Sequence, residues 1–484
     1  MSANPQEIVH QVRQEFESIL GFVLEASPQS VPDADCMERG LLSRMLELGR
    51  LLLHLYFVQQ NRHIAPETVV GREGRSLTLH SHKERAYLSV FGEVRFARRY
   101  YYCRGEGHAP LDAALNLPPC AMSDFLREWQ EKLSVCVPYQ QTTAILRDLL
   151  GLSVSTRQVQ QAVLEDAPLM GAYFARAQPP PQNLQATLLV VQADGKGVPM
   201  RQTTEASQKV RKTKGEKSSR KKEAIVTSVC TLEPTPRSPK EVIASLFEGV
   251  KSQDQRPAPQ NKRLFATLAG KESALQFTAQ QANQYEGEPL CHRIALCDGA
   301  EALQQKMQEQ FPEFTLALDF IHALEYLWKA ANALLGETAP ERTQWVKTRA
   351  LQMLSGQALA LITELRQTAA LPECPPLTAK TLLSVAGYYE RNQNYMRYDQ
   401  FLALGWPIAT GVIEGACRHL VKDRCELSGM RWTQEGAEAL LHLRCVHENG
   451  HWNEFHTFRR EQRRKTLYPQ KQELSPITRG RLVA

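Results

Sequence analysis

Two short apolar runs in this chain end in the same pair of residues, an aspartate followed by a glycine. Leu188–Val191 leads into Asp194-Gly195, and Arg293–Cys297 leads into Asp298-Gly299. A short apolar run that ends in a carboxylate and a glycine predicts a buried strand that carries one acid at its tip. A plain Asp-Gly turn after a strand is the alternative interpretation.

A third acid, Glu414, lies in a helical rather than a strand pattern. Apolar residues recur around it at helical spacing, at Val412, Ile413, Cys417, Leu420 and Val421. Carboxylates that meet in space repel one another and persist when cations lie between them. Oxygen-only ligands suit Mg²⁺, with Mn²⁺ as a substitute. Two such ions can stabilise the attacking and the leaving oxygen when a phosphodiester bond is broken.

Longer stretches around these acids resemble a known family. They are LVVQADGKGVPM, ALCDGAEALQQKMQEQFPEFTLALDFIHALEYLW, GWPIATGVIEGACRHLVKDRCELSGMRW and, upstream, RRYYYCRGEGHAPLDAALNLPP. On these motifs, which extend over nearly the whole chain, the sequence resembles bacterial DDE transposases of the ISKra insertion-sequence family. It is more distantly similar to the Mutator-like and hAT transposases, which share a ribonuclease H-like core.

The resemblance implies a DNA transposase that cuts the ends of its own element and joins them to target DNA. It places the catalytic triad at Asp194, Asp298 and Glu414, which would hold two Mg²⁺ ions, with Asp194 bridging them. The implied partners are double-stranded DNA, as terminal inverted repeats and as target. Because two ends are processed together, we expect at least a homodimer or a higher homo-oligomer.

The second metal ligand has two candidates. Phe314–Leu318 is another apolar run, and it leads into Asp319, which is followed three residues later by His322. Asp319 is therefore also an acid at a strand tip, and spacing does not decide between it and Asp298. The resemblance favours Asp298 and gives Asp319 and His322 supporting places beside the site. A purely structural role for His322 is the alternative.

Length and pattern predict a multidomain α+β and α/β chain with a ribonuclease H-like core, a helical insertion, and helical, small β and helix-turn-helix regions before the core. The expected boundaries are: helical region 1–65; β-rich region 66–120; helix-turn-helix region 121–176; first part of the core 186–322; helical insertion 323–405; last part of the core 406–450; and a flexible basic tail 451–484.

Composition indicates which partners and which cellular compartment suit this chain. The formal net charge is +6, which is compatible with nucleic acid but weakly diagnostic. The 11 cysteines contain no C-x-x-C pair, which indicates a reducing compartment and argues against a zinc ribbon. No secretory signal or apolar run long enough for a membrane is visible, so we expect a cytoplasmic, nucleoid-associated bacterial protein with no membrane partner.

The region 121–176 is the best candidate for reading DNA. Tyr139–Leu150 has a helical pattern, a turn with Gly151 follows, and Ser155 or Thr156 would cap a second helix. This is the outline of a helix-turn-helix, and an ordinary αα-hairpin is the alternative. The side chains expected to contact DNA from the second helix are Arg157, Gln158 and Gln161.

Basic side chains elsewhere give further candidate phosphate contacts. Arg98 and Arg99 precede three tyrosines, although a half-buried strand with a solvated arginine face fits equally well. A run of eight basic residues within Lys209–Lys222 predicts a loop that binds phosphates, or a plain solvated loop. The candidates in that run and after Glu414 are Lys209, Arg211, Lys212, Lys214, Arg220, Lys221, Lys222, Arg418 and Lys422.

Two other functions remain open at this point. One is a sequence-specific DNA-binding protein, such as a repressor, on an inactive transposase scaffold. The other is a nuclease of the same fold that cleaves without strand transfer. Intact acids at all three triad positions argue against the first.

Overall fold

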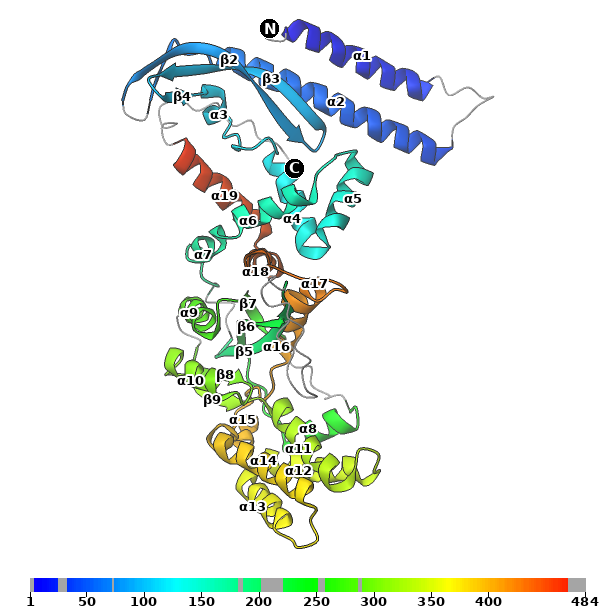
Figure 1. The fold of residues 1–484 in the computed structure, drawn as a ribbon, viewed down its shortest axis with the longest axis vertical. Coiled ribbons are helices and arrows are strands. Elements are labelled where there is room, and N and C mark those ends of the chain that lie inside the picture. Colours follow the sequence, from blue (N-terminus) through cyan, green and yellow to red (C-terminus); the bar gives the residue numbers. More distant parts are fainter. Residues whose placement is uncertain are drawn as a thin grey trace, which may run out of the picture. The chain divides into compact units, whose positions relative to one another are not determined.

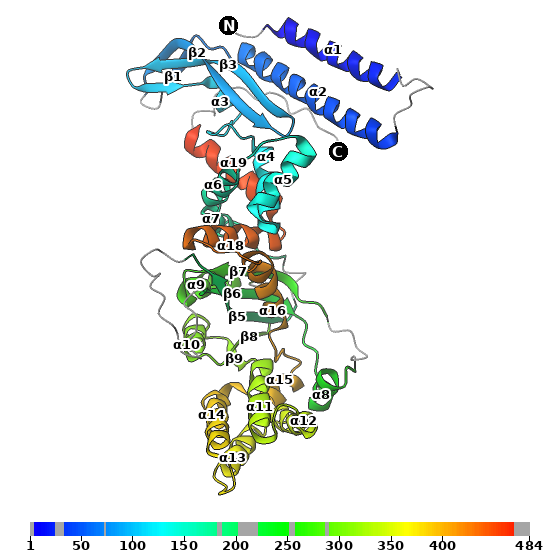
Figure 2. The ribbon, with the colours of Figure 1, turned by 45° about the vertical axis from the view of Figure 1, so that its right-hand side comes forward.

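The computed structural model describes residues 4–24, 33–71, 74–181, 186–201, 221–250, 257–285 and 290–468. The chain divides into two compact units (Figures 1 and 2). The terminal unit consists of Met1–Asp166 with Trp452–Ala484, and the central unit is Ala167–His451. In the described parts of the chain, no helix combines the length and apolar character needed to cross a bilayer.

The terminal unit begins with two helices, α1 (Pro5–Leu24) and α2 (Ala34–His63), as the apolar spacing predicts. Asp33 caps α2 by accepting a hydrogen bond from the Cys36 backbone N–H at 2.7 Å. A four-stranded antiparallel sheet follows, in the order β1 (Thr68–Val70), β2 (Ser76–Ser89), β3 (Gly92–Cys103) and β4 (Glu106–His108). Its long β2–β3 hairpin turns just before Gly92.

The remaining helices of the terminal unit are α3 (Pro110–Ala114), α4 (Asp124–Cys136), α5 (Tyr139–Leu150), α6 (Thr156–Asp166) and α19 (Trp452–Leu467). The two helices expected around Gly151 are present. Gly151 ends α5 in the left-handed conformation at φ 66°, which glycine adopts without steric cost. Ser155, rather than Thr156, caps α6, because its Oγ accepts from the Gln158 N–H at 3.2 Å.

The flexible basic tail expected at 451–484 is wrong over its first part, which forms α19. Two of its arginines, Arg459 and Arg463, face other side chains of the unit rather than solvent. Arg459 is 6% exposed and pairs with Asp124 and Asp166, and Arg463 pairs with Asp124. The acids of α4 and α6 thus hold this basic segment in the fold.

The central unit is built on a five-stranded sheet in the order β7-β6-β5-β8-β9. The strands are β5 (Leu188–Pro199), β6 (Lys221–Leu232), β7 (Gln260–Thr267), β8 (His292–Cys297) and β9 (Thr315–Leu318). β6 is antiparallel to both β5 and β7, whereas β5, β8 and β9 run parallel. The central position of β5 explains why Leu188–Ala193 is buried throughout and reads as a continuous apolar run.

Two cores cover the two faces of this sheet. Leu189 and Val191 face one core, with α9 (Lys271–Ala282) and α10 (Glu301–Gln310). Leu188 and Val190 face the other, with α8 (Pro239–Phe247) and the helices after β9. This alternation is the two-residue period of a strand and fixes which face each later side chain points toward.

The segment after β9 is helical, as expected, and its helices pack together in Figure 2. They are α11 (Phe320–Leu335), α12 (Glu341–Leu354), α13 (Ala358–Ala369), α14 (Pro376–Asn392), a 3₁₀ turn (Gln393–Tyr395) and α15 (Tyr398–Ala403). The unit is completed by α7 (Leu169–Phe174), α16 (Gly411–Ala416), a π-helical turn (Cys417–Lys422), α17 (Asp423–Cys425) and α18 (Gln434–Glu448).

Candidate active site

Three aspartates lie next to one another on, or directly after, the three parallel strands of the central sheet. Ala193 is in register with Cys297, and Cys297 is in register with Leu318, so Asp194, Asp298 and Asp319 follow one another across β5, β8 and β9. Because these strands are parallel and adjacent, the three positions lie side by side, Asp298 and Asp319 directly after β8 and β9, and Asp194 within β5, which continues to Pro199. Asp194 and Asp298 also continue the series of residues that face the core of α8 and α11.

The charges of these acids act on one another. Burial raises the pKa of Asp298, and the negative charge of Asp194 adds to that rise. Among the described residues, no arginine or lysine forms an ion pair with Asp194, Asp298 or Glu414. The site therefore has an excess of negative charge, which an all-oxygen donor set can share with a hard divalent cation.

The glycines after the two aspartates leave room for neighbouring side chains. Neither Gly195 nor Gly299 has a positive φ. A Cβ at Gly195 would meet the Glu223 carboxylate, and one at Gly299 would meet the Tyr388 ring. These glycines serve close packing beside the acids. The simple Asp-Gly turn considered from the sequence is wrong at β5, which continues as a strand through Asp194-Gly195, whereas after β8 the chain does bend at Gly299.

Asp319 is the most enclosed of the strand-end acids, at 0% exposure. Its Oδ1 accepts from the Ile321 N–H at 2.6 Å, and its Oδ2 accepts from both the Thr410 N–H, at 3.1 Å, and the Thr410 hydroxyl. Burial acts to raise the pKa of Asp319, but these hydrogen bonds and the contact with His322 outweigh it and hold the pKa below its usual value. Its oxygens are committed to protein donors, whereas Asp298 accepts from the Ala300 N–H at 3.1 Å.

His322 lies beside Asp319 on α11, with its Nδ1 3.5 Å from Asp319 Oδ2. This contact raises the pKa of His322 to about 9, although burial opposes the rise. The ring is therefore positively charged near neutral pH and is the cationic group that lies among the acids.

Glu414 lies on α16, which packs against β5 and β6. It is exposed, and Cys417, three residues later, points its Sγ toward Asp194 Oδ2 at 3.5 Å. Burial raises the pKa of Cys417, and the charges of Asp194 and Glu414 add to that effect. Glu414 is thus within electrostatic range of the sheet edge, although among the described residues the triad is not a group whose carboxylate oxygens all lie within 4.8 Å of one another.

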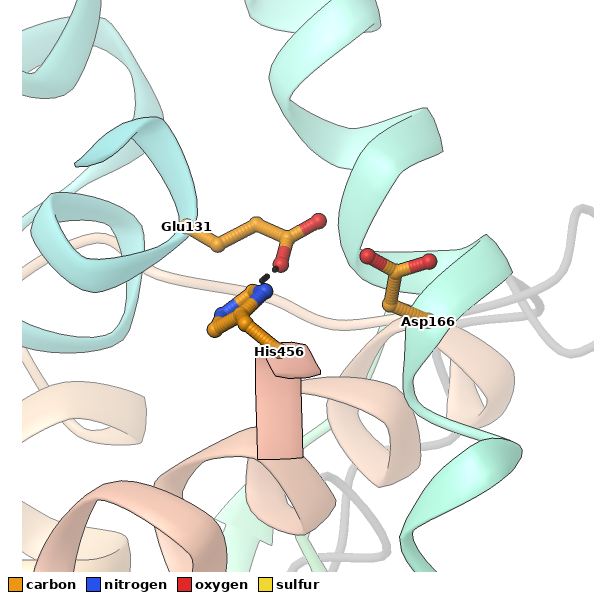
Figure 3. A group of neighbouring side chains, drawn as sticks. All are labelled: Glu131, Asp166 and His456. Atoms are coloured by element: carbon orange, nitrogen blue, oxygen red, sulfur yellow. Dashed lines mark ion pairs between the residues drawn. The ribbon is translucent and has the colours of Figure 1, made fainter. Parts of the chain in front are cut away.

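A second acidic cluster, which the sequence did not reveal, lies inside the terminal unit (Figure 3). Glu131 of α4, Asp166 of α6 and His456 of α19 are buried, and their ligand atoms lie within 4.8 Å of one another, close enough to hold a metal ion. Its members are distant in sequence. On α4, polar residues that include Arg127 and Gln130 are buried, so this helix packs a charged face inward. That burial is visible in the structure and not in the sequence.

Arginines already neutralise much of this cluster. Arg127 donates to Glu131 at 3.0 Å and to both oxygens of Asp166, and Arg459 donates to Asp166 at 3.0 Å. Burial and the nearby arginines lower the pKa of His456 to about 3, so the site disfavours an added positive charge on that ring. Burial and the charge of Asp166 raise the pKa of Glu131 well above its usual value, which favours a proton there. The arrangement suits a neutral, buried polar core. The Mg²⁺ pair predicted from the sequence was assigned to Asp194, Asp298 and Glu414, and not to this cluster.

The expected DNA contacts in the helix-turn-helix divide into free and engaged side chains. Arg157 is exposed on α6. Gln158 accepts from the Ser155 N–H at 2.9 Å and so completes the cap, and Gln161 donates to Glu165 at 3.1 Å. Arg157 is therefore the side chain of the three that has no such engagement on the helix.

The other basic candidates differ in the same way. Arg98 is mostly buried against Asp112, which also pairs with Arg85, while Arg99 is half-buried. Lys221 pairs with Glu426 at 2.7 Å, and Lys222 is half-buried in β6. Arg418 and Lys422 are exposed on the π-helical turn that follows α16, and Arg418 lies 3.5 Å from Asp423. Lys209, Arg211, Lys212, Lys214 and Arg220 lie outside the described residues.

Comparison with known proteins gives little. No known family model matches the sequence, and no curated protein matches it. Among solved structures, the chain is similar to the Drosophila P element transposase strand transfer complex, with a TM-score of 0.31 and 9% identity over 69% of this chain and 94% of that chain. At this TM-score the likeness is too weak to identify a fold or a function.

Proposed function

We propose that this chain is a metal-dependent DNA transposase whose catalytic residues are Asp194, Asp298 and Glu414. One observation carries the proposal: two partly exposed aspartates lie side by side, one within β5 and one directly after β8, and the short helix α16, which packs against β5, carries an exposed glutamate. Among the described residues, no arginine or lysine pairs with these acids, which is the condition in which carboxylates bind a divalent ion.

In this proposal the central sheet is the ribonuclease H-like core, and α11–α15 form the helical insertion between its second and third acids. The mixed five-stranded sheet, with the two aspartates side by side, supports this assignment. Asp298 rather than Asp319 is the second ligand, because the oxygens of Asp319 are taken by Ile321, Thr410 and the contact with His322.

The triad would hold Mg²⁺, or Mn²⁺ in its place, as a pair of ions that polarise a phosphodiester and activate a water or a 3′-hydroxyl. The chain's own residues position the substrate. His322 carries a positive charge near neutral pH and is placed to hold a phosphate oxygen. Arg418 and Lys422 present exposed cations beside Glu414, and Arg157 presents one on the helix-turn-helix.

The partner is double-stranded DNA, as element ends and as target, and the acting form is a homodimer or a higher homo-oligomer in the cytoplasm of a bacterium. The protein would bind the ends through its helix-turn-helix and phosphate-contacting cations, so its affinity should fall steeply with salt.

The test is cleavage and joining of duplex DNA that carries the sequences flanking the gene, with Mg²⁺ or Mn²⁺ present. Wild type and the control Glu337→Gln, an exposed acid far along the chain, should cut and join, and Asp194→Asn and Glu414→Gln should do neither. Tight binding of the ends without cleavage would replace the proposal with a DNA-binding protein on an inactive scaffold. Cleavage without joined products would replace it with a nuclease.

A further inference from the structure

The helix that carries Glu414 lacks a side-chain cap of its own. The first N–H groups of any helix have no partner inside it. Thr410 is the N-cap of α16, yet its side chain accepts no hydrogen bond from the first turn. With six residues before the π-helical turn, α16 is too short to be stable by itself.

Two side chains from the sheet supply the missing acceptors. Gln192 Oε1 accepts from the Ile413 N–H at 3.1 Å, and Asp319 Oδ2 accepts from the Thr410 N–H at 3.1 Å. The Thr410 hydroxyl donates to the same Asp319 oxygen. The two acceptors come from β5 and from the end of β9, and they are 221 and 91 residues away in sequence from the groups they bind.

All of these groups are buried. Gln192, Ile413, Thr410 and Asp319 are each no more than 2% exposed, so no water replaces a lost acceptor. Ser228 Oγ donates to the same Gln192 oxygen at 3.4 Å, a longer hydrogen bond than the one from the Ile413 N–H. Gln192 also precedes Asp194 by two residues and so points to the same face of β5.

The geometry therefore couples two triad positions through a single strand. Ile413 is adjacent to Glu414, and the Glu414 N–H makes its helical bond to the Thr410 carbonyl at 3.0 Å. Any shift of the Thr410 and Ile413 amides moves the Glu414 carboxylate relative to Asp194. Displacements of about 0.5 Å are enough to matter in a catalytic constellation.

We propose that Gln192 and Asp319 are positioning residues that cap α16 from the sheet and thereby set the place of Glu414 opposite Asp194. This inference rests on the proposed function for its catalytic meaning, while the capping itself is a property of the fold. Neither residue needs to touch DNA or a metal ion in this role.

The experiment compares Gln192→Met, which keeps the length and removes the acceptor, with Ser228→Ala, which removes the other hydrogen bond to Gln192 and leaves α16 untouched. Thr410→Val and Thr410→Ser form a second pair, because only serine keeps the hydroxyl donor. Thermal unfolding checks that each variant is folded, and if Gln192→Met fails to fold, Thr410→Val carries the test.

Two readouts are measured. Hydrogen exchange at the Ile413 and Glu414 amides, without metal or DNA, should become faster in Gln192→Met and stay as in wild type in Ser228→Ala. DNA-end cleavage by Gln192→Met should need about 10- to 100-fold more Mg²⁺ for half-maximal rate, the usual effect of removing a residue that orients a metal ligand. Thr410→Ser should keep the slow hydrogen exchange and the low Mg²⁺ requirement that Thr410→Val loses.

The outcomes distinguish the capping of α16, the positioning of Glu414 and the proposed function from one another. Unchanged exchange at Ile413 in Gln192→Met overturns the capping. Faster exchange with a wild-type Mg²⁺ requirement overturns the positioning of Glu414. If wild type cleaves no DNA end while exchange at Ile413 still accelerates in Gln192→Met, the proposed function fails and the capping stands.

Discussion

The two units of this protein each gather carboxylates, and they treat them in opposite ways. In the terminal unit, Glu131 and Asp166 are fully enclosed and are met by Arg127 and Arg459. In the central unit, Asp194 and Asp298 are partly exposed and no arginine or lysine of the described residues pairs with them. The first arrangement neutralises its acids within the fold, and the second leaves negative charge for something that binds from outside.

Mutations in the two groups of acids should therefore have different effects. Loss of a strand-edge acid should remove function and spare stability, because a repelling charge is removed. Loss of a partner in the terminal cluster should remove stability, because a buried charge is left without compensation.

The largest expected effect is on catalysis. Asp298→Asn should lower the rate of DNA-end cleavage by roughly 10⁴-fold, about 5 kcal/mol of activation free energy. Its unfolding temperature should not fall, because the burial of a charged Asp298 is already unfavourable. Cleavage kinetics and thermal unfolding, beside the control Glu337→Gln, check both halves. A variant that loses stability along with activity would contradict the contrast between the two clusters.

The next effect is on stability. Arg127→Met should lower the free energy of unfolding of the terminal unit by about 3–5 kcal/mol, because Glu131 and Asp166 lose their shared donor. Urea unfolding followed by hydrogen exchange in α4 and α6 measures it. Arg147→Met, which breaks an exposed pair with Asp148, should cost about 0–1 kcal/mol. Similar losses in both variants would mean that the buried network has no special weight.

Metal binding should also distinguish the acids of the central unit from those of the terminal cluster. Mg²⁺ at about ten times its dissociation constant should stabilise the central unit by about 1.4 kcal/mol. The gain should vanish in Asp298→Asn and persist in Glu131→Gln. Thermal unfolding with Mg²⁺ and then with excess chelator reports it. A gain that disappears in Glu131→Gln instead would place the cation in the terminal cluster.

The smallest effect is on the pH dependence of stability. The raised pKa of Glu131 means that the folded state keeps a proton that the unfolded state has lost, so stability falls as pH rises above the usual glutamic acid range. His456 acts in the opposite sense, since its lowered pKa costs stability only as pH falls below about 6.5. Asp166, Arg127 and Arg459 face both groups.

Between about pH 7 and about pH 9, His456 is neutral in both states and does not contribute. His322, whose pKa is raised to about 9, titrates in this range in wild type and in Glu131→Gln alike, so the difference between the two unfolding profiles reports Glu131. Glu131→Gln, which mimics the protonated carboxyl, should show a flatter profile than wild type over this range. Equal slopes in the two proteins would show that Glu131 is ionised in the folded state.

The sequence predicted those parts of the fold that local patterns encode. The strands that lead into Asp194 and Asp298 follow from short apolar runs, although β5 continues past Asp194 to Pro199, so the prediction that this acid lies at a strand tip is wrong. The turn at Gly151 and the cap at Ser155 follow from residue types that suit those backbone positions. The alternation of buried faces along β5 is likewise a property of neighbouring residues.

What could not be predicted depends on distant pairings. Gln192 looks like an ordinary polar residue in a strand, and its partner at Ile413 lies 221 residues away. Arg459 and Arg463 look like solvated charges of a tail, because the acids that bury them belong to helices near the other end of the chain. Pattern and propensity carry no information on such partners, so the terminal cluster and the capping of α16 appear only in the structure.

The terminal unit is assembled from both ends of the chain, with the whole central unit between them. During translation α4 and α6 leave the ribosome long before α19, so Asp124 and Asp166 lack Arg459 until α19 has been made. A polypeptide that terminates before α19 would keep Asp166 paired with Arg127 but would lack the pairs with Arg459 and Arg463, and its terminal unit would be incomplete. The order of synthesis thereby acts as quality control, since only a chain translated through α19 can complete this unit.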